Sequence, residues 1–185
     1  AEGKDVLVLA AGEPDFDTPL NIRKAASEAM DSGQTRYVPG KGTPALQKAI
    51  QSKFLNDNNL QYDLDEIIVG VGGKHIIYNA MMATINPNDE VIIPAPFWVS
   101  YPDIVLLAEG KPVIVQCPES QNFKITADQL EKNITDKTKW LMLNSPSNPT
   151  GSLYSKHELK QLAEVLLEYP NVLVMSDDIY EKVMY

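Results

Sequence analysis

The sequence predicts an α/β protein, a three-layer α/β/α architecture built on a mostly parallel sheet. Short apolar segments alternate along the chain with longer segments of helical periodicity, and repeated β-α-β steps of this kind form parallel sheets with helices on both faces. The last apolar run, 172–175, is continuous, which is typical of a strand covered on both faces. Most of the candidate site residues follow a predicted strand at its carboxyl end, where open α/β sheets bind ligands.

The N-terminal part of the chain predicts a short strand over 6–9 and two helices. The strand runs into Gly12, which could expose backbone N–H groups to a carboxylate or could be an ordinary turn glycine. Helical spacing over 21–32 predicts the first helix. Thr43 is expected to cap the second helix, with Pro44 at its first position. The inward face of this helix should carry Leu46, Ile50 and Phe54.

From residue 67 onward, predicted strands and helices alternate regularly. Each predicted strand is a short apolar run, and each predicted helix is a longer segment with apolar residues at helical spacing. The predicted strands are 67–71, 90–94, 111–116, 139–143 and 172–175, and the predicted helices are 76–83, 98–108, 126–132 and 155–168.

Composition and charge exclude several classes of protein. A chain of 185 residues with 44% apolar content can bury a substantial core. Its formal net charge of −9 argues against a general binder of nucleic acid or anionic membranes, and no apolar run approaches the length of a membrane span. The single cysteine, Cys117, excludes an internal disulfide and a cysteine-based zinc cluster. It fits a reducing compartment, and the expected location is the cytoplasm. His75 and His157 have no ligand-like spacing, so no metal site is expected.

Two loops are candidates for phosphate binding. At Gly72-Gly73-Lys74 a predicted strand gives way to a helix, and this arrangement can hold a phosphate on free N–H groups at the positive end of the helix dipole. The spacing of the glycines matches neither a Walker loop nor a dinucleotide fingerprint. The alternative is that the two glycines only form the turn between the strand and the helix. The pair Arg36-Tyr37 could reach a phosphate or could lie in solvent.

Two further loops could contact a flat or polar ligand. Trp98 follows a proline-rich turn that could present its indole face to a ligand, and a core tryptophan is the alternative. In the stretch 144–151, two prolines fix the backbone while Asn148 offers both a donor and an acceptor. Asn-Pro and Thr-Gly pairs are also common in turns.

The carboxylates Asp177 and Asp178 directly follow the last predicted strand. Burying a carboxylate away from water is energetically unfavourable unless a cation or several hydrogen-bond donors contact it. One of the two aspartates is therefore expected to meet a positively charged partner. Tyr180 is close enough in sequence to reach the same ligand. The alternative is that the two aspartates cap a following helix.

Six stretches, taken together, resemble the aspartate aminotransferase family, the class I aminotransferases that bind pyridoxal phosphate in their large domain. They occur in the family's order at 12–19, 36–37, 72–74, 97–102, 148–151 and 176–180. The resemblance implies the fold of that family in truncated form. Residues 1–20 would belong with the small domain and 21–185 would form the N-terminal part of the large cofactor-binding domain.

The resemblance also implies roles for the residues around the cofactor ring. Asp177 resembles the carboxylate that pairs with the pyridine nitrogen, which keeps the ring able to accept electrons. Tyr180 and Asn148 resemble the pair that hydrogen-bonds the phenolic oxygen of the ring. Trp98 resembles the stacking indole.

The phosphate and substrate contacts follow from the same resemblance. The N–H groups of Gly72, Gly73 and Lys74 resemble the phosphate cradle, and Tyr37 resembles the phenol that reaches the phosphate of a neighbouring subunit's cofactor. In the bacterial branch of the family, a lysine at the position of Lys74 faces the distal carboxylate of aspartate or glutamate. The implied substrate-contacting residues are Gly12, Lys74, Trp98 and Asn148.

The expected activity is that of a homodimeric aminotransferase acting on aspartate and 2-oxoglutarate, with prephenate as a further candidate substrate. The family's Schiff-base lysine and its α-carboxylate arginine lie beyond Tyr185, so the 185 residues alone are expected to be inactive. Three alternatives stay open: a cofactor-binding sensor domain of a transcription regulator, a lyase or acyl-transfer enzyme of the same fold, and a catalytically incompetent fragment.

Overall fold

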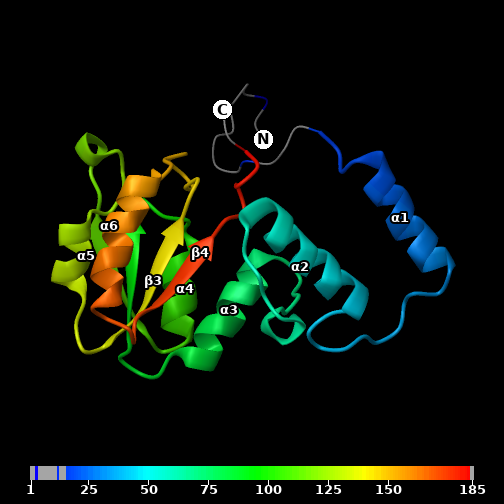
Figure 1. The fold of residues 1–185 in the computed structure, drawn as a ribbon, viewed down its shortest axis with the longest axis horizontal. Helices are drawn as coiled ribbons and strands as arrows, with labels where there is room; N and C mark the ends of the chain where they lie inside the picture. The colour runs from blue at the N-terminus through cyan, green and yellow to red at the C-terminus, as the bar shows by residue number, and fades with distance from the viewer. Residues whose placement is uncertain (1–2, 4–11, 13–15, 184–185) are drawn as a thin grey trace. The chain divides into compact units, whose positions relative to one another are not determined.

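The computed structural model describes residues 3, 12 and 16–183 (Figure 1). The chain divides into two compact units, 1–68 and 69–185. The predicted strand over 6–9 lies outside the described residues. The assignment of 1–20 to a small domain and of 21–185 to a large one stays a prediction.

In the unit 1–68, the described residues form the helices α1 (Leu20–Asp31) and α2 (Pro44–Asn58) and the 3-10 turn η1 (Leu64–Glu66). The predicted start of α2 is confirmed. Thr43 Oγ1 accepts a hydrogen bond from the N–H of Leu46 at 3.3 Å, and Pro44 occupies the first helical position, where its missing N–H costs nothing.

The predicted inward face of α2 is wrong at Leu46, which is 44% exposed. The buried residue of this helix is its neighbour Gln47, whose Nε2 donates to the carbonyl oxygens of Ile67 at 2.7 Å and Leu64 at 3.0 Å. Carbonyl groups removed from water need donors. An apolar pattern cannot reveal this, because here the buried position is filled by an amide that serves the backbone of a later segment.

The unit 69–185 contains a four-stranded parallel sheet in the order β2-β1-β3-β4. The strands are β1 (Glu90–Ala95), β2 (Lys111–Gln116), β3 (Thr138–Asn144) and β4 (Leu173–Asp177). β2 pairs with one edge of β1, and β3 pairs with the other edge, followed by β4. A sheet with this order has its topological switch point between β1 and β3, and a crevice forms there at the carboxyl ends of the strands.

Helices cover both faces of the sheet, which confirms the predicted three-layer α/β/α class (Figure 1). One face packs against α3 (Gly73–Thr84) and α4 (Ser100–Leu107), and the other packs against α5 (Ala127–Asn133) and α6 (Lys156–Leu167). Successive residues of a strand point to opposite faces. The side chains of β1 follow this rule: Val91 and Ile93 join the cluster with α3 and α4, whereas Ile92 joins the cluster with α5 and α6.

The predicted strand over 67–71 is absent from the described structure. A strand needs a hydrogen-bonded neighbour, and no described strand pairs with this segment. Ile68 is 62% exposed and Val71 is 89% exposed. Instead of pairing with another strand, the N–H of Val71 donates to Nδ1 of His75 at 3.2 Å.

The prediction that the last strand is covered on both faces is also wrong. β4 pairs with β3 on one side and forms an edge of the described sheet. Leu173 and Val174 remain 38% and 45% exposed. The apolar run therefore identified a strand correctly, but it did not reveal the position of that strand in the sheet.

An ion pair connects the start of α6 to the loop that precedes α5. Glu158 Oε1 lies 2.5 Å from Lys124 Nζ, and Glu158 Oε2 accepts from the N–H of Ser155 at 2.7 Å. Ser155 Oγ accepts in return from the N–H of Glu158 at 3.2 Å, which completes a capping box. Lys124 first, and then the bonds from Ser155, lower the pKa of Glu158 to about 2.

We expect this ion pair to make the stability of the protein depend on pH. Because the pKa of Glu158 is lower in the folded state than in the unfolded chain, the stabilisation is present above about pH 4.5 and is lost as the pH falls toward 2. Between about pH 5 and 3, the free energy of unfolding should therefore fall less steeply for Glu158→Gln than for the wild type, as measured by urea denaturation. Glu164→Gln is the control, since its partner Lys160 lies 3.7 Å away and both side chains are exposed. Equal slopes for Glu158→Gln and the wild type would contradict the assignment.

Candidate functional site

A cavity of about 450 Å³ opens where β3 and β4 end and α3 begins. Its volume lies within the range of small-molecule sites. All of its lining residues belong to the unit 69–185, and they come from the ends of several elements. They are Gly72, Gly73, Lys74, Ile77, Trp98, Tyr101, Asn144, Asn148, Asp177, Ile179 and Tyr180.

The cavity brings together the predicted site residues of this unit, Gly72, Gly73, Lys74, Trp98, Asn148, Asp177 and Tyr180. The other two, Gly12 and Tyr37, belong to the unit 1–68. Tyr37 is fully exposed there. The roles of Gly12 and Tyr37 stay predictions.

The start of α3 presents N–H groups that no side chain caps. Gly72 is the N-cap residue, with φ 94° and ψ 162°, and no side-chain hydrogen bond caps the helix. His75 stabilises this turn, because its Nδ1 accepts a hydrogen bond from the N–H of Val71 at 3.2 Å. Its Nε2 lies 3.0 Å from Asn79 Nδ2. An uncapped helix start in a cavity wall is suited to an anion.

Trp98 lies in the loop between β1 and α4, and Lys74 lies over its ring. The ammonium nitrogen of Lys74 is 4.9 Å from the centroid of the indole, within cation-π distance. Trp98 is half-buried and also packs against the core cluster of α3 and α4. Its indole therefore serves both the core and the cavity, so the two readings of Trp98 are compatible.

The two aspartates after β4 have different surroundings. Asp177 Oδ2 accepts from the hydroxyl of Tyr101 at 2.7 Å, and Asp177 lines the cavity. Asp178 is exposed, and its Oδ1 accepts from Ser176 Oγ at 2.7 Å. Asp177 is therefore the carboxylate of the cavity. Residues 179–182 form turns, so within the described chain the aspartates cap no helix.

Asn144 joins the loop after β3 to the end of β4. Its Nδ2 donates to the carbonyl oxygen of Asp177 at 2.8 Å, and its Oδ1 accepts from the N–H of Asn148 at 2.7 Å. Asn144 and Asp177 also face each other in the register of β3 and β4. Asn144 was not among the site residues predicted from the sequence. The signal that could have found it is its place as the last residue of a central strand.

Tyr101 is the second site residue that the sequence analysis missed. It is 3% exposed and lies in the first turn of α4. Burial, followed by the hydrogen bond to Asp177 and the charge of that carboxylate, raises the pKa of the Tyr101 phenol well above its ordinary value. The hydroxyl therefore remains protonated and keeps donating its hydrogen to Asp177.

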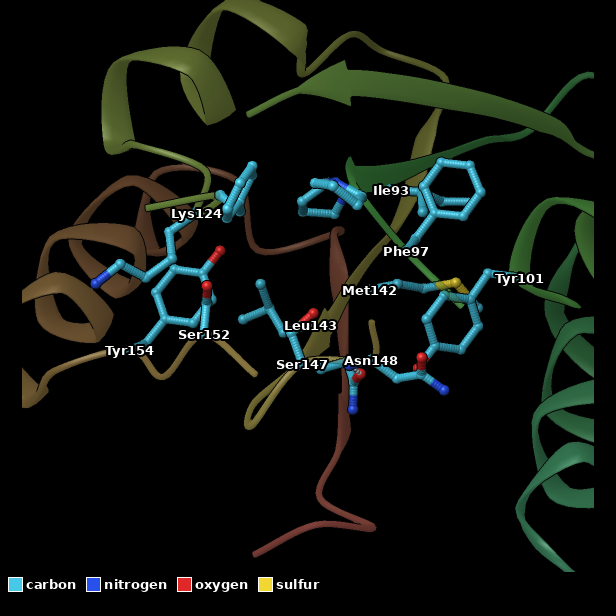
Figure 2. A pocket seen from close by; sticks show the side chains of 14 residues that line it. Ile93, Phe97, Tyr101, Lys124, Met142, Leu143, Ser147, Asn148, Ser152 and Tyr154 are labelled. Atoms are coloured by element: carbon cyan, nitrogen blue, oxygen red, sulfur yellow. Dashed lines mark hydrogen bonds between the residues drawn. The ribbon is translucent and has the colours of Figure 1, made fainter. Parts of the chain in front are cut away.

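A second, narrower cavity shares part of its wall with the first. Tyr101, Asn144 and Asn148 line both cavities. Figure 2 shows Tyr101 and Asn148 on one side of this narrower cavity, and Lys124 and Tyr154 on the opposite side. Tyr101 and Tyr154 are thus two buried tyrosines in separate surroundings.

The larger cavity combines three recognition elements. Asp177 provides a negative charge, Trp98 provides a flat aromatic surface, and the start of α3 provides N–H groups for an anion. These features suit a flat ligand that carries a protonated nitrogen and an anionic group. Among the residues that the structure describes, no three or more His, Cys, Asp or Glu side chains are grouped to hold a metal ion. No described helix is long and apolar enough to span a membrane.

The sequence profile of the family described as aminotransferase class I and II matches residues 4–185. The chain belongs to this family. Within the family, the chain is 60% identical over 183 residues to a probable aspartate/prephenate aminotransferase of Rickettsia bellii. The match covers 99% of this chain and 46% of that protein. It is 53% identical to an aspartate aminotransferase of Rhizobium meliloti, covering 100% of this chain and 45% of the relative.

Solved aminotransferase structures share the fold. The crystal structure of the aspartate aminotransferase from Rhizobium meliloti matches with a TM-score of 0.97 and 53% identity, over 100% of this chain and 46% of that one. The Thermus thermophilus aspartate aminotransferase with maleate matches with a TM-score of 0.95 and 42% identity, over 100% of this chain and 48% of that one. The chain thus has the aspartate aminotransferase fold in truncated form and spans about half the length of these relatives.

Proposed function

We propose that the full-length protein carrying this sequence is a pyridoxal-phosphate-dependent aminotransferase that transfers the amino group of aspartate to 2-oxoglutarate. The observation that carries the proposal is the cavity itself. In a member of the aminotransferase family, a carboxylate, an indole and an uncapped helix start line one pocket. Pyridoxal phosphate has a matching chemistry, with a basic ring nitrogen, a flat ring and a phosphate.

Each residue of the cavity has a proposed role toward the cofactor. Asp177 holds the proton on the ring nitrogen, and Trp98 stacks on the ring. Tyr180 and Asn148 hydrogen-bond the phenolic oxygen, and the start of α3 at Gly72 binds the phosphate. When bound, the protonated ring supplies an electron sink for the bond that breaks at the substrate Cα.

The proposed substrates are dicarboxylates. Lys74 provides a cation at the cavity, and a carboxylate is its natural partner. The similar Thermus thermophilus enzyme was solved with maleate, a dicarboxylate, and the Rickettsia bellii relative is named for aspartate and prephenate. Both names support an acidic substrate, which we propose to meet Lys74, Asn148 and Trp98 in the cavity.

The remaining parts of the site are proposed to come from other segments. In the family pattern, the lysine that binds the cofactor and the arginine that binds the α-carboxylate belong to segments outside these 185 residues. We also propose a cytoplasmic homodimer, in which the exposed Tyr37 reaches the cofactor phosphate of the neighbouring subunit.

The test is a transamination assay on the full-length protein with aspartate and 2-oxoglutarate. We expect oxaloacetate and glutamate in equal amounts, and dependence on added pyridoxal phosphate after dialysis. Cofactor binding without turnover would favour the sensor alternative, and consumption of aspartate without glutamate would favour a lyase.

Replacing Lys74 should change substrate preference. We expect Lys74→Met to lower kcat/KM for aspartate by about 10- to 100-fold, because the substrate loses a charge-assisted hydrogen bond. An amino acid with an apolar side chain should lose less. Lys160→Met is the matched control, since Lys160 lies in α6 and has only an exposed partner. Equal losses for both classes of substrate would contradict a role of Lys74 in specificity.

A further inference from the structure

The carboxylate of Asp177 is held by a tyrosine from a distant part of the sequence. The hydroxyl of Tyr101 donates to Asp177 Oδ2 at 2.7 Å, across 76 residues of sequence. The donor recorded for Oδ1 is the N–H of Ile179, at the longer distance of 3.4 Å. A hydrogen bond to a charged oxygen is short and strong, whereas a contact of 3.4 Å is weak. Oδ2 is therefore committed to Tyr101, and Oδ1 is the oxygen available to a ligand.

Tyr101 is itself held rigidly. Its N–H donates to the carbonyl oxygen of Trp98 at 3.0 Å, and its ring packs edge-on against the indole with 5.4 Å between centroids. It belongs to the core cluster that includes Ile104 and Met142. A buried ring in a packed core holds its rotamer, so its hydroxyl is fixed relative to Asp177.

We propose that Tyr101 is a positioning residue of the aminotransferase site. Its hydroxyl fixes the Asp177 carboxylate so that Oδ1 meets the protonated ring nitrogen of the cofactor, and its ring supports the indole of Trp98. This inference rests on the proposed function. It assigns the same tyrosine to both groups that contact the cofactor ring, so a single buried side chain couples the orientation of the carboxylate to that of the indole.

The test compares Tyr101→Phe with Tyr154→Phe in the full-length protein. Both changes remove one hydroxyl from a buried tyrosine, and Tyr154 is 9% exposed. The hydroxyl of Tyr154 accepts from the N–H of Ile125 at 2.9 Å, on the other side of the narrower cavity from Tyr101 (Figure 2). A general loss of packing or of a buried hydrogen bond therefore affects both variants, whereas only Tyr101→Phe frees Asp177.

We expect Tyr101→Phe to lower kcat by about 10- to 100-fold, with a smaller effect on KM, because a hydrogen bond to a charged group is lost. The second readout is the ¹⁵N chemical shift of the cofactor's ring nitrogen as a function of pH. In Tyr101→Phe the ring nitrogen should lose its proton at a lower pH than in the wild type, because a loosely held carboxylate pairs less well with it. Tyr154→Phe should follow the wild type in both readouts.

The outcomes separate the two proposals. A wild-type protein that binds no pyridoxal phosphate would refute the proposed function. A wild type that transaminates, together with a Tyr101→Phe variant that matches Tyr154→Phe in kcat and in ring-nitrogen titration, would refute the positioning role alone. If Tyr101→Phe does not fold, the hydroxyl proton of Tyr101 decides the question. That proton should exchange slowly with water in the wild type and faster in Asp177→Asn, and equal exchange rates would overturn the inference.

Discussion

Replacing Asp177 with alanine in the full-length protein should lower kcat by about 150- to 5000-fold while leaving the fold intact. Removing one partner of a desolvated ion pair costs about 3–5 kcal/mol, and each 1.36 kcal/mol of barrier is a factor of ten in rate. Without the carboxylate, the ring nitrogen has no partner for its proton, so the cofactor accepts electrons less well. The measurement is steady-state turnover with aspartate and 2-oxoglutarate, beside a thermal unfolding curve.

The neighbouring residue provides the matched control for this prediction. Asp178 differs from Asp177 by one position, but it is exposed and its Oδ1 accepts from Ser176. Asp178→Ala should therefore keep near-normal turnover. If the two alanine variants lost activity equally, the assignment of Asp177 as the carboxylate of the cavity would be wrong. If Asp177→Ala kept normal turnover, the proposed pairing with the ring nitrogen would be wrong.

Local chemistry allowed the sequence to predict the elements of the fold well. Thr43 and Pro44 predict the start of α2, because capping depends only on contacts between nearby residues. In the structure the Thr43 hydroxyl caps the helix as predicted. The strand predicted over 111–116 has the observed bounds of β2, Lys111–Gln116. Periodicity and capping depend on residues a few positions apart, so they can be seen in one sequence.

The errors arise where distant segments decide the outcome. The segment 67–71 has the composition of a strand, but no described strand pairs with it. Leu46 is apolar but exposed, and Gln47 is buried because carbonyl groups some 20 residues away need its amide. Neither fact is encoded in a local pattern, since both depend on which segments meet in the folded chain.

The candidate site shows the same division. The sequence predicted Trp98, Asn148 and Asp177 as site residues because each lies in a recognisable motif after a strand, and all three line the cavity. The residues alone left the choice between Asp177 and Asp178 open, and the family resemblance favoured Asp177. In the structure Asp177 lines the cavity and accepts from Tyr101, whereas the exposed Asp178 accepts from Ser176. Tyr101 was missed because its significance is a contact with a residue 76 positions away. Motifs therefore reveal the groups proposed to touch a ligand, whereas the groups that orient them require the structure.

The second large effect is expected at Gly72, which adopts φ 94° and ψ 162° at the start of α3. This backbone region is essentially restricted to glycine, and an alanine held there costs about 1–3 kcal/mol. A Cβ at Gly72 would meet no atom within 4 Å, so the expected cost comes from the backbone and not from crowding. Gly72→Ala should therefore displace the N–H groups at the helix start and weaken pyridoxal phosphate binding by about 5- to 150-fold.

The adjacent glycine separates this backbone effect from the mere addition of a methyl group. Gly73 lies inside α3, its φ is not positive, and a Cβ there also meets no atom within 4 Å. Gly73→Ala should leave the free energy of unfolding unchanged or raise it by up to about 1 kcal/mol, because alanine favours the helix. Gly72→Ala should lower it. Urea denaturation of the cofactor-free protein and a pyridoxal phosphate titration monitored by absorbance measure the two effects. If the two variants were equally stable and bound the cofactor equally well, the backbone at Gly72 would have no special role in the phosphate site.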